Sequence, residues 1–368
     1  MLYTCAPGCR DPRHGHGPAG WTGEGPRPFT IDVHCHRLDV AVARKAAVLE
    51  PARHDPSTIF ANALTRETNV RQMTERSAQL TDVGRRLADM DRMGIDMQIV
   101  SPAPFQYHYF APPDTGAALS REINEGLQDL VAAHPDRFAA LGTAPLQDPA
   151  LAMRELTHAM TRLGLKGLEI GTNVHGLDLT DPRLGLEPFF ALANELDAVL
   201  FLHPVGYSDG GRLTEHYFNN VIGNPLETTV AASHLIFAGV PARYPRIRFM
   251  LAHGGGYLAH YWARMDHAWH ARPDCRGAID QPPSHYLRRM YFDSVLFDPV
   301  LLGALVARYG AQHVLLGTDY PYDMGEDDPV GLVASVQAMS DAERASVMGR
   351  NAVQVFGLSG VPTESRFQ

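Results

Sequence analysis

The sequence predicts an α/β fold and, within that class, a closed (β/α)8 barrel of the TIM type. Short apolar segments alternate with segments of helical length, which is typical of a parallel sheet. Eight such repeats follow one another, as a closed barrel requires. Single barrels with insertions also reach a length of 368 residues. An open doubly wound sheet is the alternative, but no glycine-rich phosphate loop follows the first strand.

The expected strands are short and apolar, and Gly94 and Gly164 each end a predicted helix directly before one of them. In chain order the strands span residues 29–36, 97–101, 138–142, 167–171, 198–203, 248–253, 290–294 and 313–319. The helices between them span residues 82–93, 115–134, 148–163, 186–197, 226–240, 257–270 and 298–309. Further helices at about 329–357 are expected to pack outside the barrel.

The last strand carries the strongest single signal. Leu315, Leu316 and Gly317 run up to Asp319, and Pro321 stops the strand directly afterwards. This pattern predicts a buried strand that delivers a carboxylate to its C-terminal end. A buried carboxylate is costly unless it is paired or binds a metal. Asp319 therefore needs partners.

The chain is expected to hold one large domain at residues 28–360. Residues 1–27 are rich in Gly, Pro, Arg and His without apolar periodicity, which predicts an irregular N-terminal lead-in. Two long connections, at 37–80 and 205–225, interrupt the barrel pattern, and connections of this length usually cover or contact a substrate. The lead-in also contains two cysteines and two histidines, but their spacing matches no familiar zinc finger.

Composition narrows the function classes. A net charge of -9 argues against a nucleic-acid or anionic-membrane surface. No apolar run is long enough to span a bilayer, and no signal-peptide core is present at the start. The four cysteines are too few and too scattered for a disulfide framework: Cys5, Cys9, Cys35 and Cys275. We therefore expect a cytoplasmic enzyme that acts on a small molecule.

The titratable residues that point to chemistry stand at the predicted C-terminal ends of strands, where barrels carry their active sites. They are His34, His36, His203, His253 and Asp319. Residues i and i+2 of a strand share a face, so the His34 and His36 side chains should both point inward. Imidazoles together with a carboxylate suit zinc, and also iron or manganese. The sequence therefore predicts a metal site.

His253 differs from the other histidines because three glycines follow it, Gly254 to Gly256. Glycines allow a ligand or a backbone to approach the imidazole closely. We expect His253 to lie beside the metal as a general acid or base. A role as a fifth ligand is the alternative.

These motifs resemble those of the amidohydrolase superfamily, in the amidohydrolase 2 branch that contains aminocarboxymuconate semialdehyde decarboxylase. The resemblance runs from about residue 29 to 358 and rests on His34-x-His36, His203-Pro204, His253-Gly-Gly-Gly and Gly317-Thr-Asp319-Tyr-Pro321. It implies a mononuclear metal site with His34, His36, His203 and Asp319 as ligands and with His253 as the catalytic base. It also implies a homodimer or a higher oligomer.

The resemblance further implies two arginines that hold the substrate carboxylate. Arg264, eleven residues after His253, matches an arginine that family members lend across a dimer interface. A guanidinium fork suits this task. A second arginine is expected on the connection after the first strand, where Arg71 and Arg76 are both candidates.

A second metal is also conceivable. No lysine stands at the tip of the strand 167–171, so the carbamylated-lysine bridge of dinuclear amidohydrolases is not expected. Glu169 inside that apolar strand and His234 in an otherwise apolar helix could nevertheless serve a second ion, as in dinuclear oxygen-using relatives. Alternatively, Glu169 is paired within the barrel and His234 lies on a helix face.

The function that follows is a metal-dependent decarboxylase, a carbon–carbon lyase without an organic cofactor, acting on a small unsaturated or aromatic carboxylic acid. Zinc is the expected divalent ion, with manganese or iron as alternatives. The competing interpretations keep the fold but change the reaction, to a hydrolase or hydratase or to a dinuclear iron or manganese oxygenase.

Overall fold

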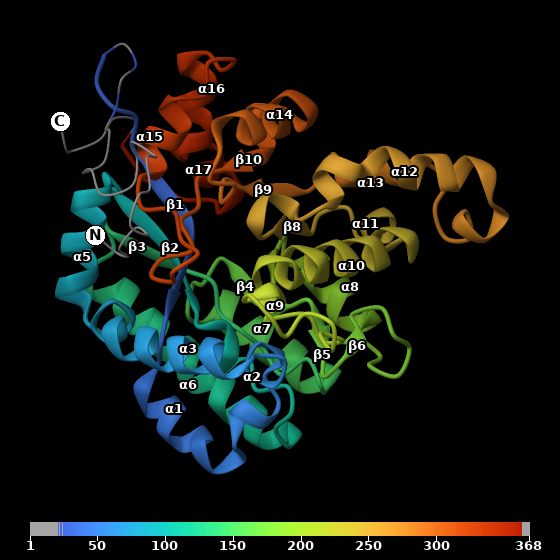
Figure 1. The fold of residues 1–368 in the computed structure, drawn as a ribbon, viewed down its shortest axis with the longest axis horizontal. Helices are drawn as coiled ribbons and strands as arrows, with labels where there is room; N and C mark the ends of the chain where they lie inside the picture. Colours follow the sequence, from blue (N-terminus) through green and yellow to red (C-terminus); the bar gives the residue numbers. More distant parts are fainter. Residues whose placement is uncertain (1–20, 22, 24, 363–368) are drawn as a thin grey trace.

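The computed structural model describes residues 21, 23 and 25–362 (Figure 1). Most of the expected lead-in at 1–27, including its cysteines and histidines, lies outside the described residues, and its irregular character stays a prediction. In the described part of the chain, no helix combines the length and the apolarity that crossing a membrane requires.

Parallel strands form the centre of the molecule. One sheet contains β1, β2 and β3, and a second has the order β10-β9-β8-β7-β4. Every pairing between neighbours in these two sheets is parallel. The strands are β1 (Ile31–Arg37), β2 (Met97–Pro102), β3 (Phe138–Ala140), β4 (Gly167–Gly171), β7 (Val199–His203), β8 (Arg248–Leu251), β9 (Tyr291–Asp293) and β10 (Val314–Leu315). A short antiparallel hairpin, β5 (Asn173–Val174) and β6 (Leu177–Asp178), follows β4.

Two further contacts close these sheets into a barrel. Gly142 and Leu168 form a parallel bridge that joins the end of β3 to β4. Cys35 of β1 forms a parallel bridge with Tyr320, beyond β10. The Val33 N–H also donates to the Leu316 carbonyl at 2.9 Å. The predicted eight-stranded barrel is confirmed, and the alternative of an open sheet is wrong.

Helices surround the barrel (Figure 1). Those that follow the strand-and-helix alternation are α5 (Val83–Met93), α6 (Pro113–Ala133), α7 (Pro149–Thr161), α8 (Glu187–Glu195), α10 (Gly223–Phe237), α12 (Leu258–Ala271) and α14 (Pro299–Tyr309). Their ends follow local rules: Asp82, Asp148 and Asp298 cap N-termini through their carboxylates, and Gly94 ends α5 in the left-handed conformation. The remaining helices are α1 (Val40–Ala46), α2 (Pro56–Ile59), α3 (Ala63–Glu75), α4 (Ser77–Thr81), α9 (Phe218–Val221), α11 (Val240–Arg243), α13 (Pro283–Leu287), α15 (Pro329–Ala334), α16 (Asp341–Ala345) and α17 (Asn351–Val355).

Alternate residues of the strands face two different apolar environments. On β7, Val199 and Phe201 belong to a cluster with residues of β1, β2, β8 and β10, which fills the barrel interior. Leu200 and Leu202 belong to the larger cluster that contacts the surrounding helices. His203 therefore continues the inward-facing series at the end of the strand. Phe356, directly after α17, packs into the same interior cluster.

Strand β1 departs from simple alternation. Its pairing with β2 shifts register between Asp32 and Cys35. Ile31, before the shift, packs in the interior cluster, whereas Cys35, after it, packs in the outer one. Such bulges re-aim side chains beside active sites. Because of the bulge, His34 and His36 point toward the functional end of the barrel. The alternation at the start of β1 would otherwise turn them the other way.

Several strands are shorter than the sequence predicts, and two of them end before a candidate site residue. β8 ends at Leu251 rather than at residue 253, and β10 ends at Leu315 rather than at 319. In both places the chain turns sharply, because His253 and Asp319 have φ values of 55° and 58°. Left-handed backbone at non-glycine residues is costly and is concentrated at functional sites. These two side chains therefore reach the site from turns instead of from strand ends.

The two long connections are not irregular loops. Residues 37–80 contain α1, α2, α3 and α4, and residues 205–225 contain α9 and the start of α10. The connection at 37–80 was predicted from the sequence, but the helices within it were not. Helix α3 buries none of its residues, so it lacks the apolar stripe from which a helix is predicted.

Candidate active site

A cavity of about 630 Å³ opens at the C-terminal ends of the barrel strands. This volume is within the range of pockets that hold small organic ligands, roughly 300–1,000 Å³. His203 and Asp319 lie at its inner end, and much of its side is contributed by residues 51–60 and by parts of 205–224. Both long connections therefore contact the ligand space, as their length suggested.

Four of the predicted residues form one compact cluster at the inner end. The candidate ligand atoms of His34, His36, His203 and Asp319 all lie within 4.8 Å of one another, and all four residues are buried. Asp319 Oδ1 is 3.1 Å from His36 Nε2 and 3.3 Å from His34 Nε2. The His203 ring lies within 5 Å of both other rings, with centroid distances of 4.9 Å to His34 and 4.8 Å to His36.

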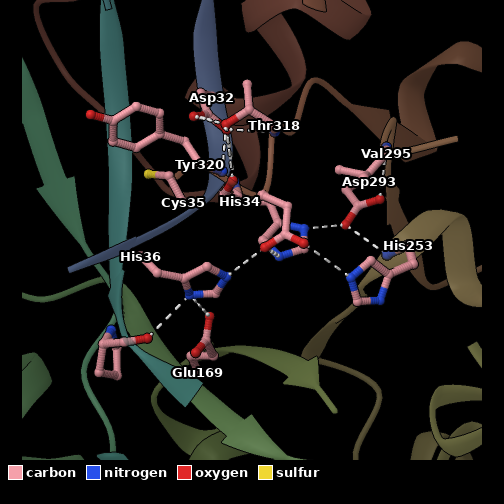
Figure 2. A network of polar contacts seen from close by, with 12 residues as sticks. Asp32, His34, Cys35, His36, Glu169, His253, Asp293, Val295, Thr318 and Tyr320 are labelled. Carbon is pink, nitrogen blue, oxygen red and sulfur yellow. Dashed lines mark hydrogen bonds and ion pairs between the residues drawn. The ribbon is translucent and has the colours of Figure 1, made fainter. Parts of the chain in front are cut away.

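Asp293, at the end of β9, supports His34 from behind (Figure 2). His34 Nδ1 lies 2.6 Å from Asp293 Oδ2, and because a carboxylate only accepts, the imidazole donates. The same carboxylate accepts the backbone N–H groups of His253 and Gly254 at 2.9 and 2.8 Å. It thus fixes the orientation of His34 with Nε2 toward Asp319, and it holds the turn that contains His253.

His36 is held from behind by the Pro102 carbonyl, with Glu169 somewhat farther away. His36 Nδ1 is 3.1 Å from the Pro102 carbonyl and 3.6 Å from Glu169 Oε2 (Figure 2). Tyr107 donates to Glu169 Oε1 at 2.7 Å. Burial raises the pKa of Glu169, although His36 and Tyr107 act in the opposite direction. Glu169 is therefore paired through Oε1, while its buried Oε2 has no hydrogen-bond partner within the described chain.

Two members of the cluster, His203 and Asp319, are in the form that binds a cation, whereas His34 is not. Burial alone would lower the pKa of His34, but Asp319 and Asp293 outweigh it and raise that pKa well above its usual value, so a metal has to displace its proton. Burial lowers the pKa of His203 well below its usual value, with His36 and His34 adding to the effect, so its imidazole is neutral. Burial alone would raise the pKa of Asp319, but the neighbouring imidazoles outweigh it and hold that pKa well below normal. Neutral imidazole and ionised carboxylate are the forms that bind metals.

The unpaired atoms of the cluster fit a metal as well. His34 Nε2 and both ring nitrogens of His203 are buried without a hydrogen-bond partner. Buried polar atoms normally have one. Three imidazoles and one carboxylate match the donor preferences of zinc and related divalent ions. The chain thus carries a site for a divalent metal, for which His34, His36, His203 and Asp319 are the candidate ligands.

His253 lies beside this cluster rather than within it. Its Nε2 is 3.5 Å from Asp319 Oδ2, and its ring is 5.3 Å from that of His203 and 5.4 Å from that of His34. Its Nδ1 has no hydrogen-bond partner within the described chain. The side chain is 14% exposed, whereas that of His34 is fully buried. This placement suits a proton carrier next to a metal site.

The structure separates the three candidate arginines. Arg76, directly after α3, is buried and lines the cavity together with Asp319. Arg71 is exposed on α3 and does not belong to the cavity lining. Arg264 is exposed on α12, which extends away from the barrel on the right of Figure 1. Within a single chain only Arg76 of these three reaches the cavity, and the expected role of Arg264 across a dimer interface stays a prediction.

The residues suggested for a second metal are not brought together. Glu169 faces His36 inside the barrel, whereas the His234 side chain is 48% exposed and pairs with Asp178 Oδ2 at 3.2 Å. Within the described chain, the possible metal cluster contains neither of them. This arrangement agrees with the alternative interpretation, in which Glu169 is paired and His234 lies on a helix face.

Sequence reasoning left the role of Asp293 unassigned, although the residue falls in the expected strand 290–294. Its signal is the same as that of Asp319, since it is an acidic residue at the C-terminal end of an apolar strand. Tyr107 was missed because it lies in the connection after β2, where no periodic pattern exists.

Comparisons with known proteins agree with this geometry. A model of the amidohydrolase family matches residues 31–358. A 2-amino-3-carboxymuconate-6-semialdehyde decarboxylase from Dictyostelium discoideum is 33% identical over 274 residues, covering 74% of this chain and 76% of the relative. A gamma-resorcylate decarboxylase from Rhizobium sp. (strain MTP-10005) is 28% identical over 298 residues, covering 75% and 87% of the two chains. The crystal structure of a 5-carboxyvanillate decarboxylase from Sphingomonas paucimobilis superposes with a TM-score of 0.79 at 27% identity, covering 91% of this chain and all of the other.

Proposed function

The chain belongs to the amidohydrolase family, and from this premise we propose that it is a metal-dependent carboxy-lyase that decarboxylates a small unsaturated or aromatic carboxylic acid. The observation that carries the proposal is the buried cluster of His34, His36, His203 and Asp319 at the inner end of a cavity, with His253 beside it. The similarity to decarboxylases of muconate and aromatic acids supports the substrate class.

In this reaction the bond between the substrate carbon and its carboxylate carbon breaks, and CO2 leaves with both oxygens. The electron pair stays on the substrate carbon, which then accepts a proton. His253 is the group that we assign to this proton transfer, because its imidazole has an unpaired Nδ1 and partial solvent access. A divalent metal held by His34, His36, His203 and Asp319 would act as a Lewis acid toward a substrate oxygen.

Arg76 is the group that we assign to a substrate carboxylate. It is the buried arginine among the candidates and lines the cavity with Asp319. A guanidinium can hold a carboxylate through two parallel hydrogen bonds. Arg264 would complete the binding of the acid if the protein forms a homodimer that places α12 of one chain over the cavity of the other.

Zinc is the ion that we propose, since three imidazoles and one carboxylate are its usual donors. Manganese is the alternative, because carboxylate and imidazole also bind it, although it favours sites with more oxygen ligands. We also propose a cytoplasmic location. Elemental analysis of protein purified without added metal distinguishes the two ions, and about one ion per chain is expected.

The decisive test is release of CO2 from a panel of acids, including γ-resorcylate, 5-carboxyvanillate and 2-amino-3-carboxymuconate semialdehyde, by metal-loaded protein. We expect the His253→Asn variant to keep its metal and to lose about 10²- to 10⁴-fold in turnover. Asparagine tolerates the left-handed backbone at this position. The matched control is His216→Asn, an exposed histidine with a φ of 54° outside the cavity lining, which should behave as wild type.

Two results would contradict the proposal. Full turnover by the metal-loaded His253→Asn variant would remove His253 from the reaction. Conversion of substrates without any release of CO2 would replace the lyase by a hydrolase or hydratase of the same fold.

A further inference from the structure

Tyr322 stands at the metal end of the cavity with a hydroxyl group that has no partner. The residue lines the cavity together with Asp319. Its ring contacts that of His36, with centroids 5.3 Å apart and planes inclined by 47°. The hydroxyl oxygen is buried and makes no hydrogen bond with any described residue. Because buried polar groups are almost always paired, this exception calls for an explanation.

Two other tyrosines of the same cavity use their hydroxyl groups within the chain, whereas His108 Nδ1 and Thr172 Oγ1, which also line it, are unpaired like Tyr322. Tyr107 donates to the Glu169 carboxylate at 2.7 Å, and Tyr109 accepts the Gly171 N–H at 3.0 Å. Both hydroxyl groups are thereby used to hold the barrel wall. Tyr322 contributes its ring to the packing around His36, but its hydroxyl contributes nothing to the folded chain. An unpaired buried donor lowers stability, so it is expected where a ligand supplies the missing acceptor.

We propose that Tyr322 is a substrate-binding residue whose hydroxyl donates a hydrogen bond to an oxygen of the group that the substrate brings to the metal cluster. This inference rests on the proposed function and specifies one of its contacts. A phenol is protonated at neutral pH and can donate. The carboxylate of an acid, or a hydroxyl or carbonyl oxygen next to it, offers an acceptor. Contact with His36 places Tyr322 beside that end of the substrate rather than at the cavity mouth.

The competing explanation is that Tyr322 serves only as a flat ring against His36. The substitution Tyr322→Phe separates the two, because it keeps the ring and removes one oxygen. We expect kcat/KM for the best acid of the panel to fall about 10- to 100-fold, as for loss of a hydrogen bond to a charged group. The metal content per chain should stay at the wild-type value.

Tyr309→Phe is the matched control. Tyr309 is also buried, but its hydroxyl donates to the Ala259 carbonyl at 2.8 Å and lies outside the cavity lining. This variant should keep the wild-type kcat/KM and should melt at a lower temperature, because it loses a satisfied hydrogen bond. Metal-free Tyr322→Phe should melt at the wild-type temperature or above it. Tyr322→Phe should therefore lower kcat/KM without lowering the melting temperature, and Tyr309→Phe should lower the melting temperature without changing kcat/KM.

Three outcomes decide the proposal. A kcat/KM of Tyr322→Phe within twofold of wild type would overturn it. A fall in melting temperature as large as that of Tyr309→Phe would overturn it too, because the hydroxyl would then be satisfied inside the protein.

If wild-type protein releases no CO2 from any acid, the proposed function fails. In that case the dissociation constant of the nitro analogue of 5-carboxyvanillate, measured on zinc-loaded protein, replaces turnover: weaker binding to Tyr322→Phe than to Tyr309→Phe supports the contact, and equal binding removes it. The melting comparison requires no ligand.

Discussion

The site consists of two regions that the fold builds in different ways. The floor is the metal cluster of His34, His36, His203 and Asp319, which is buried at the ends of barrel strands and in the turn after β10. The wall is the part of the cavity contributed by residues 51–76, 104–110 and 205–224, which is made of short helices and turns. The floor is fixed by strand pairing, whereas the wall is fixed by contacts between segments far apart in the sequence.

The floor and the wall differ in how their side chains are held, and this difference suggests a different task for each. Groups of the floor are held by further buried groups, such as the pair of Asp293 and His34 at 2.6 Å. Side chains of the wall are more varied in type and in burial: Arg76 is buried, Tyr217 is half-buried and His54 is exposed. The floor would therefore determine which metal and which chemistry operate, and the wall which acid enters. Changes in the floor should affect metal binding, and changes in the wall should affect KM.

Among the variants that distinguish floor from wall, Asp293→Asn is expected to have the largest effect, and it concerns metal affinity. The substitution removes the charge that orients His34, and carboxylates that support ligating histidines are worth about 10- to 100-fold in metal affinity. Turnover at limiting metal should fall with it. The measurement is a titration of metal-free protein against a competing chelator of known affinity.

Asp178→Asn is the control for this variant. Asp178 is a partly exposed carboxylate that also pairs with a histidine, but its partner His234 lies on the outside of α10. It should bind metal like wild type. Equal affinity of the Asp293→Asn variant would show that strand geometry alone holds the floor.

The floor could be predicted from sequence because its residues follow short apolar runs that predict buried strands. His203 ends a strand whose apolar residues alternate regularly, and the same end carries the chemistry in every barrel of this type. Prediction was weaker where local geometry departs from the ideal strand. The bulge in β1 and the left-handed turns at His253 and Asp319 leave no periodic signature.

The wall could not be predicted in the same way. Helix α3 buries no side chain, so its sequence lacks an apolar stripe, and its start and end could not be read from the sequence. The choice between Arg71 and Arg76 depended on the direction in which the end of this helix faces. That direction is set by tertiary contacts, and the structure alone distinguishes the buried Arg76 from the exposed Arg71.

The second prediction tests the wall through Arg76→Lys. Lysine keeps the positive charge but loses the planar fork, so a carboxylate held by two hydrogen bonds would lose one of them. We expect KM to rise about tenfold, the equivalent of about 1.4 kcal/mol, at unchanged metal content. Steady-state kinetics with the preferred acid provide the measurement.

Arg71→Lys, on the exposed side of α3, is the matched control and should leave KM unchanged. A rise in KM for both variants would point to an effect on α3 as a whole. A loss of metal from Arg76→Lys would mean that wall and floor are not independent.

The smallest effect is expected from His108, a wall residue in the connection after β2, and it concerns stability. Burial lowers the pKa of His108 to about 4, although a backbone contact with Gln106 acts in the opposite direction. The unfolded chain has the usual value of about 6.5 and therefore binds the proton more readily between pH 6.5 and 4. The contribution of His108 is thus fully present above pH 6.5 and is lost as the pH falls toward 4.

Between pH 7.5 and 5.5 this linkage should lower the free energy of unfolding by about 1 kcal/mol in wild type and not in His108→Asn. Asparagine accommodates the φ of 52° at this position, so the backbone need not move. Urea unfolding of metal-free protein at both pH values gives the difference, and His216→Asn at the exposed surface should reproduce wild type. If the free energy of unfolding of His108→Asn falls as much as that of wild type between the two pH values, protonation of His108 does not destabilise the fold.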